Sequence, residues 1–197
     1  SLDRFDVLVI PSGFRGSGLG ERSKEALADW VRAGGVLLAL GSSAFQCGES
    51  GLGLVSHEVK KAPEKEKSET KRRTLADVRE ERRLQQVPGN IVRIDLDPDH
   101  PISFGQSSRV HGFIGSARIF DLKGDAGDVG VLAGENPVVS GFISEQNQQA
   151  LSGGVWLVVE RKGRGKVVLF AGDPLFRAYW RGTADLFLNA LLLLANR

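Results

Sequence analysis

Two short apolar runs separated by an amphipathic segment constrain the fold of this chain more than any other feature. Residues 6–10 read DVLVI and end in a Pro-Ser-Gly turn, and residues 36–40 read VLLAL. Continuous apolar runs of this length are typical of strands buried on both faces of a sheet. Between them, residues 21–33 carry apolar side chains at helical spacing, and a glycine pair then ends the predicted helix. The strand–helix–strand unit predicts a right-handed parallel crossover in an α/β fold.

The remaining apolar segments predict further strands and a closing helix. At 197 residues and 41% hydrophobic content, the chain is sufficient for one core and one domain, residues 1–197. Strands are predicted at 91–96, 117–122, 129–133, 138–143, 155–160 and 166–170. A glycine-bearing loop joins the last two strands as a hairpin. Thr183 is the predicted N-cap of a helix whose apolar residues cover nearly all its faces, which predicts burial on more than one side.

One segment interrupts this pattern. Residues 59–86 are dense in Lys, Arg and Glu and contain few side chains that suit a core. We interpret about 57–87 as an exposed charged insertion, with a solvated helix at 74–84, weakly anchored ends and a protease-sensitive stretch at 60–73. A docking surface for an acidic partner is the alternative function of this segment.

Composition excludes several classes of partner and leaves the compartment open. The net charge of +2 gives no nucleic-acid footprint, and no apolar run reaches the length of a membrane span. The single cysteine, Cys47, excludes an internal disulfide. Because the sequence contains no Met, even at position 1, we expect a fragment of a longer protein, whose localisation is therefore unknown.

The loop between the last strand and the last helix carries more chemistry than a chain reversal needs. It contains one carboxylate and two guanidinium groups, which we predict to cluster, and two large aromatic residues: Asp173, Arg177 and Arg181, with Tyr179 and Trp180. Ligands of open α/β sheets bind just beyond the carboxyl ends of the strands. The cluster either braces the last helix or contacts a ligand or partner.

Several of these pieces together resemble a known family. RFDVLVIPSG, WVRAGG, VLLALGSSAF, DPDHPISFG and GKVVLFAGDPLFRAYWRGTADLFLNALL resemble the class I glutamine amidotransferase-like domain. The similarity is greatest to the form at the carboxyl end of certain bacterial M14-type zinc carboxypeptidases. It implies a three-layer αβα sandwich with a flavodoxin-like, mostly parallel sheet and an antiparallel edge hairpin. It also implies that a strand and a helix precede residue 6.

Active members of that family place a Cys nucleophile at a tight strand-to-helix elbow, followed later by an H-x-E base and carboxylate. Here the vestigial elbow is Gly41, Ser42 and Ser43, and AGDP follows the late strand in place of H-x-E. We interpret Cys47, a few residues further on, as an ordinary thiol. No catalytic residue is therefore predicted in this chain.

The sequence gives little support for a serine nucleophile, a metal site or a phosphate-binding loop. A Ser42 or Ser43 nucleophile needs a histidine base, and the choices are His57, His100 and His111. We interpret His100 as a structural turn residue that borders the predicted crevice. No two histidines have metal-ligand spacing, so neither a metal nor another cofactor is predicted. The glycine-rich stretch at 13–20 lacks a phosphate-binding signature and is interpreted as a mobile crossover loop.

Three functional hypotheses follow. The first is a non-catalytic accessory domain of a larger zinc carboxypeptidase, serving in docking to the preceding domain, in homo-oligomerisation or in small-ligand binding. The second is a divergent hydrolase that uses Ser42 or Ser43. The third is a carbohydrate-binding module, because Tyr179 and Trp180 suit the face of a sugar.

Overall fold

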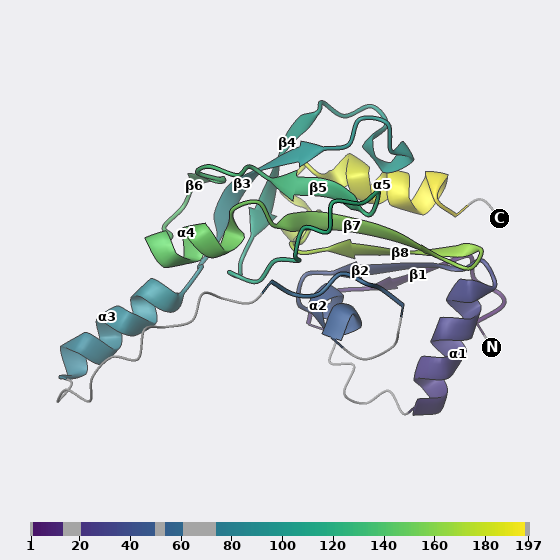
Figure 1. Cartoon of the computed structure of the whole chain (residues 1–197), viewed down its shortest axis with the longest axis horizontal. Helices are drawn as coiled ribbons and strands as arrows, with labels where there is room; N and C mark the ends of the chain where they lie inside the picture. Colours follow the sequence, from purple (N-terminus) through teal and green to yellow (C-terminus); the bar gives the residue numbers. More distant parts are fainter. Residues whose placement is uncertain (1, 14–20, 50–53, 61–73, 196–197) are drawn as a thin grey trace.

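The computed structural model describes residues 2–13, 21–49, 54–60 and 74–195, and its centre is one mixed β-sheet with helices around it (Figure 1). The strands are β1 (Val7–Ile10), β2 (Val36–Leu40), β3 (Asn90–Leu96), β4 (Arg109–Ile114), β5 (Asp128–Leu132), β6 (Val138–Ser140), β7 (Val155–Lys162) and β8 (Gly165–Phe170). The helices are α1 (Glu21–Arg32), α2 (Ser42–Glu49), α3 (Leu75–Gln85), α4 (Glu145–Leu151) and α5 (Ala184–Leu193), with 3-10 turns η2 (Pro101–Ser103) and η3 (Phe176–Ala178). The predicted α/β character is confirmed.

The sheet changes from parallel to antiparallel across its width. Its order is β1-β2-β8-β7-β5-β3-β4, with β6 also paired to β3. β1, β2 and β8 run parallel, whereas the pairs from β8 through β7, β5 and β3 to β4 are antiparallel. The β7–β8 hairpin was expected at an edge and lies in the middle. Residues 155–159 of β7 and all of β8 except Lys166 are buried, and β2 pairs with one side of the hairpin and β5 with the other.

β1 is more exposed than predicted, whereas the hairpin lies nearer the centre of the sheet than predicted. Its apolar run predicted a strand buried on both faces, but β1 pairs only with β2 and ends the described sheet. Val9 is 36% exposed as a result. Beside this strand lies an apolar groove of about 500 Å³, lined by Leu2, Leu8, Val9, Ile10, Pro11, Ser23, Ala26 and Leu27.

The last helix is also less covered than its composition predicts. Leu186, Phe187 and Ala190 face the core, and Asn189 donates hydrogen bonds to the carbonyl of Ile102 in η2 and to that of Phe104 just after it. On the outer face, Leu188 and Leu192 are 47% and 69% exposed. The prediction of burial on several sides is therefore wrong, because η2 covers α5 only in part. Thr183 takes the N-cap position, but its buried hydroxyl donates to the Pro174 carbonyl rather than capping the helix.

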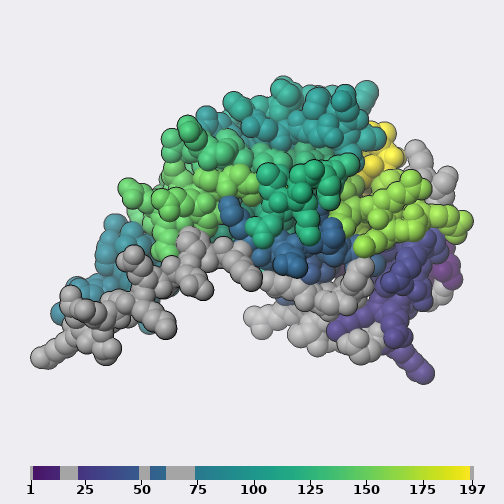
Figure 2. All heavy atoms as spheres, in the orientation of Figure 1, coloured from purple at the N-terminus to yellow at the C-terminus, as the bar shows by residue number. Residues whose placement is uncertain are grey.

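The charged segment forms the predicted solvated helix. α3 begins at a capping box in which Thr74 accepts from Asp77 N–H and Asp77 accepts from Thr74 N–H, and it buries no residue. It extends away from the sheet (Figures 1 and 2). The predicted lower boundary is wrong, since His57 is buried and Lys60 bonds to Ile119 and Ser152. The protease-sensitive stretch at 60–73, beyond Lys60, and the glycine-rich loop at 14–20 lie outside the described residues.

The strand predicted at 117–122 is reduced to isolated bridges, in which Phe120 pairs with Val59 and with Val155. In the described part of the chain, no helix combines the length and the apolar character needed to cross a membrane.

Candidate functional site

The strand-to-helix elbow is present as a backbone feature. β2 ends at Leu40, Gly41 turns the chain with φ of 53°, and α2 begins at Ser42. The N–H of Gly41 donates to the carbonyls of Phe170 and Gly172, so the elbow lies beside the carboxyl end of β8. A positive φ is accessible to glycine without strain. The elbow therefore lies where the sequence predicted it, at the carboxyl edge of the parallel strands.

The side chains of the elbow are engaged in structural hydrogen bonds. Ser42 Oγ accepts from the N–H of Gly13 at 2.8 Å and lies 3.3 Å from the hydroxyl of Ser12. Ser43 is buried, and its hydroxyl donates to the Pro11 carbonyl at 2.6 Å. Neither hydroxyl is bonded to a histidine within the described segments. These contacts tie the turn after β1 to the start of α2.

Cys47 is a packed thiol, as predicted. It lies in α2 and is 7% exposed. Burial raises the pKa of Cys47 to about 11. A thiol with this pKa is protonated at neutral pH and is a poor nucleophile, because the thiolate is the reactive form.

The predicted cluster of Asp173, Arg177 and Arg181 does not form. Asp173 Oδ1 accepts the N–H of Leu175 at 2.9 Å, so the carboxylate stabilises its own turn. In the described chain neither arginine bonds to Asp173; both are exposed, and the guanidinium of Arg177 lies over the Phe176 ring. The cluster prediction assumed that nearness in sequence brings the groups together, whereas a local backbone donor satisfies the carboxylate.

The aromatic residues of the same loop mostly pack on β4. Phe176 stacks on Phe113 with ring centroids 3.8 Å apart, and Trp180 Nε1 donates to the His111 carbonyl. Tyr179 is the exception, at 81% exposure. Between Phe176 and Trp180 in the sequence, Arg177 has a φ of 54°, which is uncommon for a residue with a side chain.

His100 lies away from this loop. Its Nδ1 accepts the N–H of Ile102 and caps η2, in line with the structural interpretation. Burial lowers the pKa of His100. The negative charge of Asp97 opposes this shift, and the positive charge of Lys166 adds to it. Lys166 belongs to the start of β8, whereas Asp173 follows its end. The residues of the predicted crevice are thus divided between the two ends of this strand.

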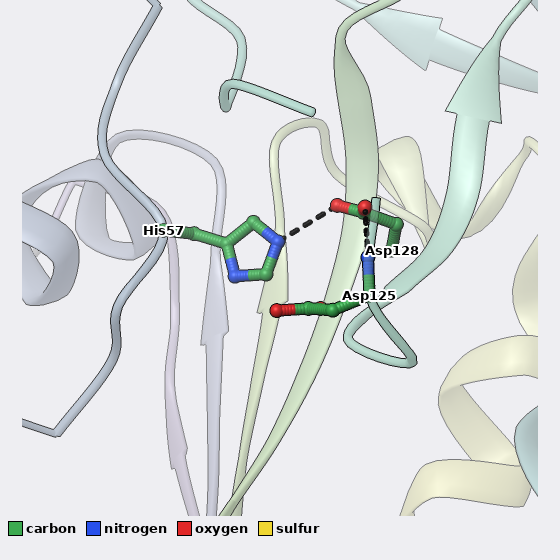
Figure 3. A group of neighbouring side chains, drawn as sticks. All are labelled: His57, Asp125 and Asp128. Carbon is green, nitrogen blue, oxygen red and sulfur yellow. Dashed lines mark hydrogen bonds and ion pairs between the residues drawn. The ribbon is translucent and has the colours of Figure 1, made fainter. Parts of the chain in front are cut away.

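A group of hydrogen-bonded polar side chains in the described chain is centred on His57. The imidazole is fully buried, and each ring nitrogen contacts a carboxylate: Nδ1 lies 2.6 Å from Glu160 Oε1, and Nε2 lies 2.8 Å from Asp128 Oδ1. Glu160 is on β7 and Asp128 begins β5, so the histidine joins segment 54–60 to two neighbouring strands. Figure 3 shows the approach of Asp128 and Asp125 to the ring.

Backbone donors hold both carboxylates in place. Glu160 accepts the N–H groups of Ser56 and His57 and the hydroxyl of Ser56. Asp128 Oδ2 accepts three successive N–H groups, those of Lys123, Gly124 and Asp125. Carboxylates that accept several backbone N–H groups are strongly stabilised in their charged form.

The protonation state follows from these contacts. Burial by itself would lower the pKa of His57, but hydrogen bonds to Glu160 and Asp128 and the charges of both carboxylates outweigh it and raise the pKa. Burial likewise opposes the ionisation of Glu160, yet the hydrogen bonds from His57 and Ser56 lower its pKa to about 2. The pKa of Asp128 is lowered against burial by His57 and the three backbone donors. With no metal ion present, the geometry is that of an imidazolium between two carboxylates.

Sequence reasoning missed this group because its members are far apart in the chain. Metal and catalytic spacing rules detect residues a few positions apart, whereas the pairing of β5 with β7 brings Asp128 and Glu160 together and segment 54–60 places His57 against both. One local signal was available: Glu160 ends the apolar run VWLVV. A carboxylate at the end of a buried strand requires a partner.

Comparisons with known proteins leave the family open. No family model matches the chain, and no curated protein sequence does. A solved structure of a cytoplasmic protein from Salmonella typhimurium is 16% identical at a TM-score of 0.46, over 100% of this chain and 74% of that one. A β-galactosidase from Rahnella sp. R3 is 15% identical at a TM-score of 0.47, over 98% of this chain and 23% of that one. Neither similarity carries an argument about function.

The geometry around Glu160 predicts a large stability effect. Glu160→Gln places an amide donor against the N–H of Ser56 and removes one charge that balances the buried imidazolium, so we expect a loss of about 3 kcal/mol in the free energy of unfolding. Urea denaturation measures this loss. The exposed neighbour provides the control: Glu58→Gln makes the same chemical change in segment 54–60 and should stay within about 0.5 kcal/mol of wild type. Equal midpoints for the two variants would contradict the bridging role of His57.

Proposed function

We propose that this chain is a non-catalytic accessory module, of the class I glutamine amidotransferase-like kind, within a larger polypeptide that includes a zinc carboxypeptidase domain. The observation that carries the proposal is an elbow with the family's backbone shape and no reactive group. The hydroxyl of Ser42 is hydrogen-bonded to Gly13 and Ser12, and that of Ser43 to the Pro11 carbonyl. The module serves in docking to the preceding domain, in pairing with a second copy or in small-ligand binding.

The turn after β8 also supports a non-catalytic role, because it carries no histidine. In an active member the base and its carboxylate follow the late strand, which corresponds to β8. Here the only acidic group of that turn, Asp173, accepts the N–H of Leu175. The buried, protonated thiol of Cys47 does not replace the nucleophile.

The arrangement of the parallel strands supports the finer fold proposal. β1, β2 and β8 are parallel neighbours, and α1 and α2 contact these strands. Parallel strands joined by helices occur almost only in sheets covered on both faces. A three-layer sandwich with a flavodoxin-like parallel half is the architecture that we propose.

The open edge of the sheet supports docking as the main role. β1 leaves its outer edge unpaired in the described chain, and the adjacent groove is lined mostly by apolar residues. Unpaired strand edges readily pair with another chain or segment. We propose that the preceding part of the same polypeptide covers β1, since Leu2 already lies in this groove.

A sugar-binding role is supported by the exposed ring of Tyr179. Trp180 contributes less to a sugar platform, because its ring nitrogen is bonded to the His111 carbonyl.

A divergent hydrolase is the second proposal for the elbow. A serine hydrolase requires a histidine within hydrogen-bond reach of Ser42 or Ser43. The buried His57 is bonded to carboxylates, and His100 to the backbone of η2.

The absence of a reactive group predicts no turnover at the elbow. Ammonia release from glutamine and hydrolysis of an activated ester should stay at background for wild type, Ser42→Ala and Ser43→Ala, because no base activates either hydroxyl. An active amidotransferase assayed in parallel shows that the ammonia assay works. Wild-type turnover that disappears in one serine variant would replace the accessory module with the divergent hydrolase.

Docking at β1 predicts slower amide hydrogen exchange of this strand in the full polypeptide than in this chain alone. Open-edge amides of Val7–Ile10 should exchange with deuterium at least tenfold more slowly in the longer protein, because a covering segment bonds to them. Amides of α3, which buries no residue, provide the internal control and should exchange equally in both. Equal exchange rates at β1 would refute the docking role, and protection that depends on concentration in the short chain would indicate pairing of two copies.

A further inference from the structure

Three potential ligand atoms converge beside the buried histidine. One each from His57, Asp125 and Asp128 lie within 4.8 Å of one another (Figure 3). His57 comes from segment 54–60, Asp125 from the loop that leads into β5, and Asp128 from the first position of that strand. The convergence therefore depends on the fold rather than on neighbouring positions in one segment.

The imidazole is oriented as in protein metal sites. Glu160 lies at Nδ1, at 2.6 Å, which leaves Nε2 facing the aspartates. Metal-binding histidines almost always donate their second ring N–H to a carboxylate or carbonyl, which fixes the tautomer and the direction of the lone pair. Glu160 is itself fixed by Ser56 and the backbone of His57, so the ring has little freedom to turn.

The charge balance of the group favours an added cation. Three carboxylates, those of Asp125, Asp128 and Glu160, surround one imidazole, and no described Lys or Arg forms an ion pair with them. An imidazolium balances one of these three charges. A divalent ion at Nε2, in place of the proton that leaves to solvent, balances two and lets the neutral ring keep its Nδ1–H bond to Glu160.

We propose that His57 Nε2 and the carboxylates of Asp125 and Asp128 bind a divalent transition-metal ion, with Glu160 as the positioning residue. One imidazole with two carboxylates suits Zn²⁺ or Mn²⁺ better than Ca²⁺, which prefers six or more oxygen ligands. Asp125 is exposed, so the ion has a path from solvent and room for water as a further ligand. The bound ion clips segment 54–60, which leads into the charged insertion, to the loop before β5.

The spacing of the ligand atoms is compatible with this ion. Two ligands at the usual zinc distances in tetrahedral geometry lie about 3.3–3.4 Å apart. Nε2 of His57 and Oδ1 of Asp128 are 2.8 Å apart, so an opening of about half an ångström admits the ion. Asp125 reaches the ion by a side-chain rotation, since the one described bond of its carboxylate is from the N–H of Gly127.

The test uses the chelator-treated chain with Zn²⁺, Mn²⁺ and Ca²⁺ as separate probes in calorimetry and thermal unfolding. We expect Zn²⁺ or Mn²⁺, at about a hundred times its dissociation constant, to raise the Tm of wild type by about 5–10 °C. Asp125→Asn keeps an acceptor for the N–H of Gly127 but removes a ligand charge, and should weaken binding at least tenfold. Asp121→Asn removes one charge from the same loop outside the ligand set and should bind as wild type does.

Co²⁺ provides a second measurement that does not depend on stability. Bound through nitrogen and oxygen ligands, Co²⁺ should give a visible absorption spectrum in wild type and Asp121→Asn, and Asp125→Asn should need at least tenfold more Co²⁺ to reach half of it. Absence of heat and of a Tm shift in wild type would overturn the proposal. Equal affinities of Asp125→Asn and Asp121→Asn would also overturn it, because the ion would then be bound elsewhere.

Discussion

A fully buried imidazole needs partners, and this requirement fixes how three distant segments of the chain meet. His57 satisfies it with Glu160 from β7 and Asp128 from β5, each already held by backbone N–H groups. A charged ring without these partners would be strongly destabilising in the interior. Segment 54–60 is therefore fixed to the sheet at the point where the charged insertion begins. The same group provides the geometry for the proposed metal clip.

The fold was predictable from sequence where one local pattern determines the structure. The apolar runs of β2 and β8 and the glycine loop between β7 and β8 each specify an element from a few residues. The position of an element within the sheet was less predictable. β1 and β2 have similar apolar runs, yet β1 is an edge strand and β2 is buried, because burial depends on neighbours that a run does not encode. The exposed leucines of α5 have the same explanation.

The candidate sites show the same division between local and distant contacts. The elbow at Gly41 was predictable because a strand, a glycine and a helix start are consecutive. The cluster around Asp173 was predicted from nearness in sequence and does not form, since the N–H of Leu175 is closer than either arginine. The His57 group was missed for the converse reason: its strong contacts span about seventy to a hundred positions. Such contacts require the sheet order, which the sequence alone did not provide.

Ring N–H protons of His57, observed by NMR in water on the metal-free protein, test the central claim most directly. If both ring nitrogens of the buried imidazole donate to these carboxylates, two ring N–H signals of His57 should be visible at pH 6, because solvent exchange is slow for buried, hydrogen-bonded protons. The exposed ring of His111 is the internal control and should give none. A His57 ring with no slowly exchanging proton, or with only one, would contradict the bridge between β5 and β7.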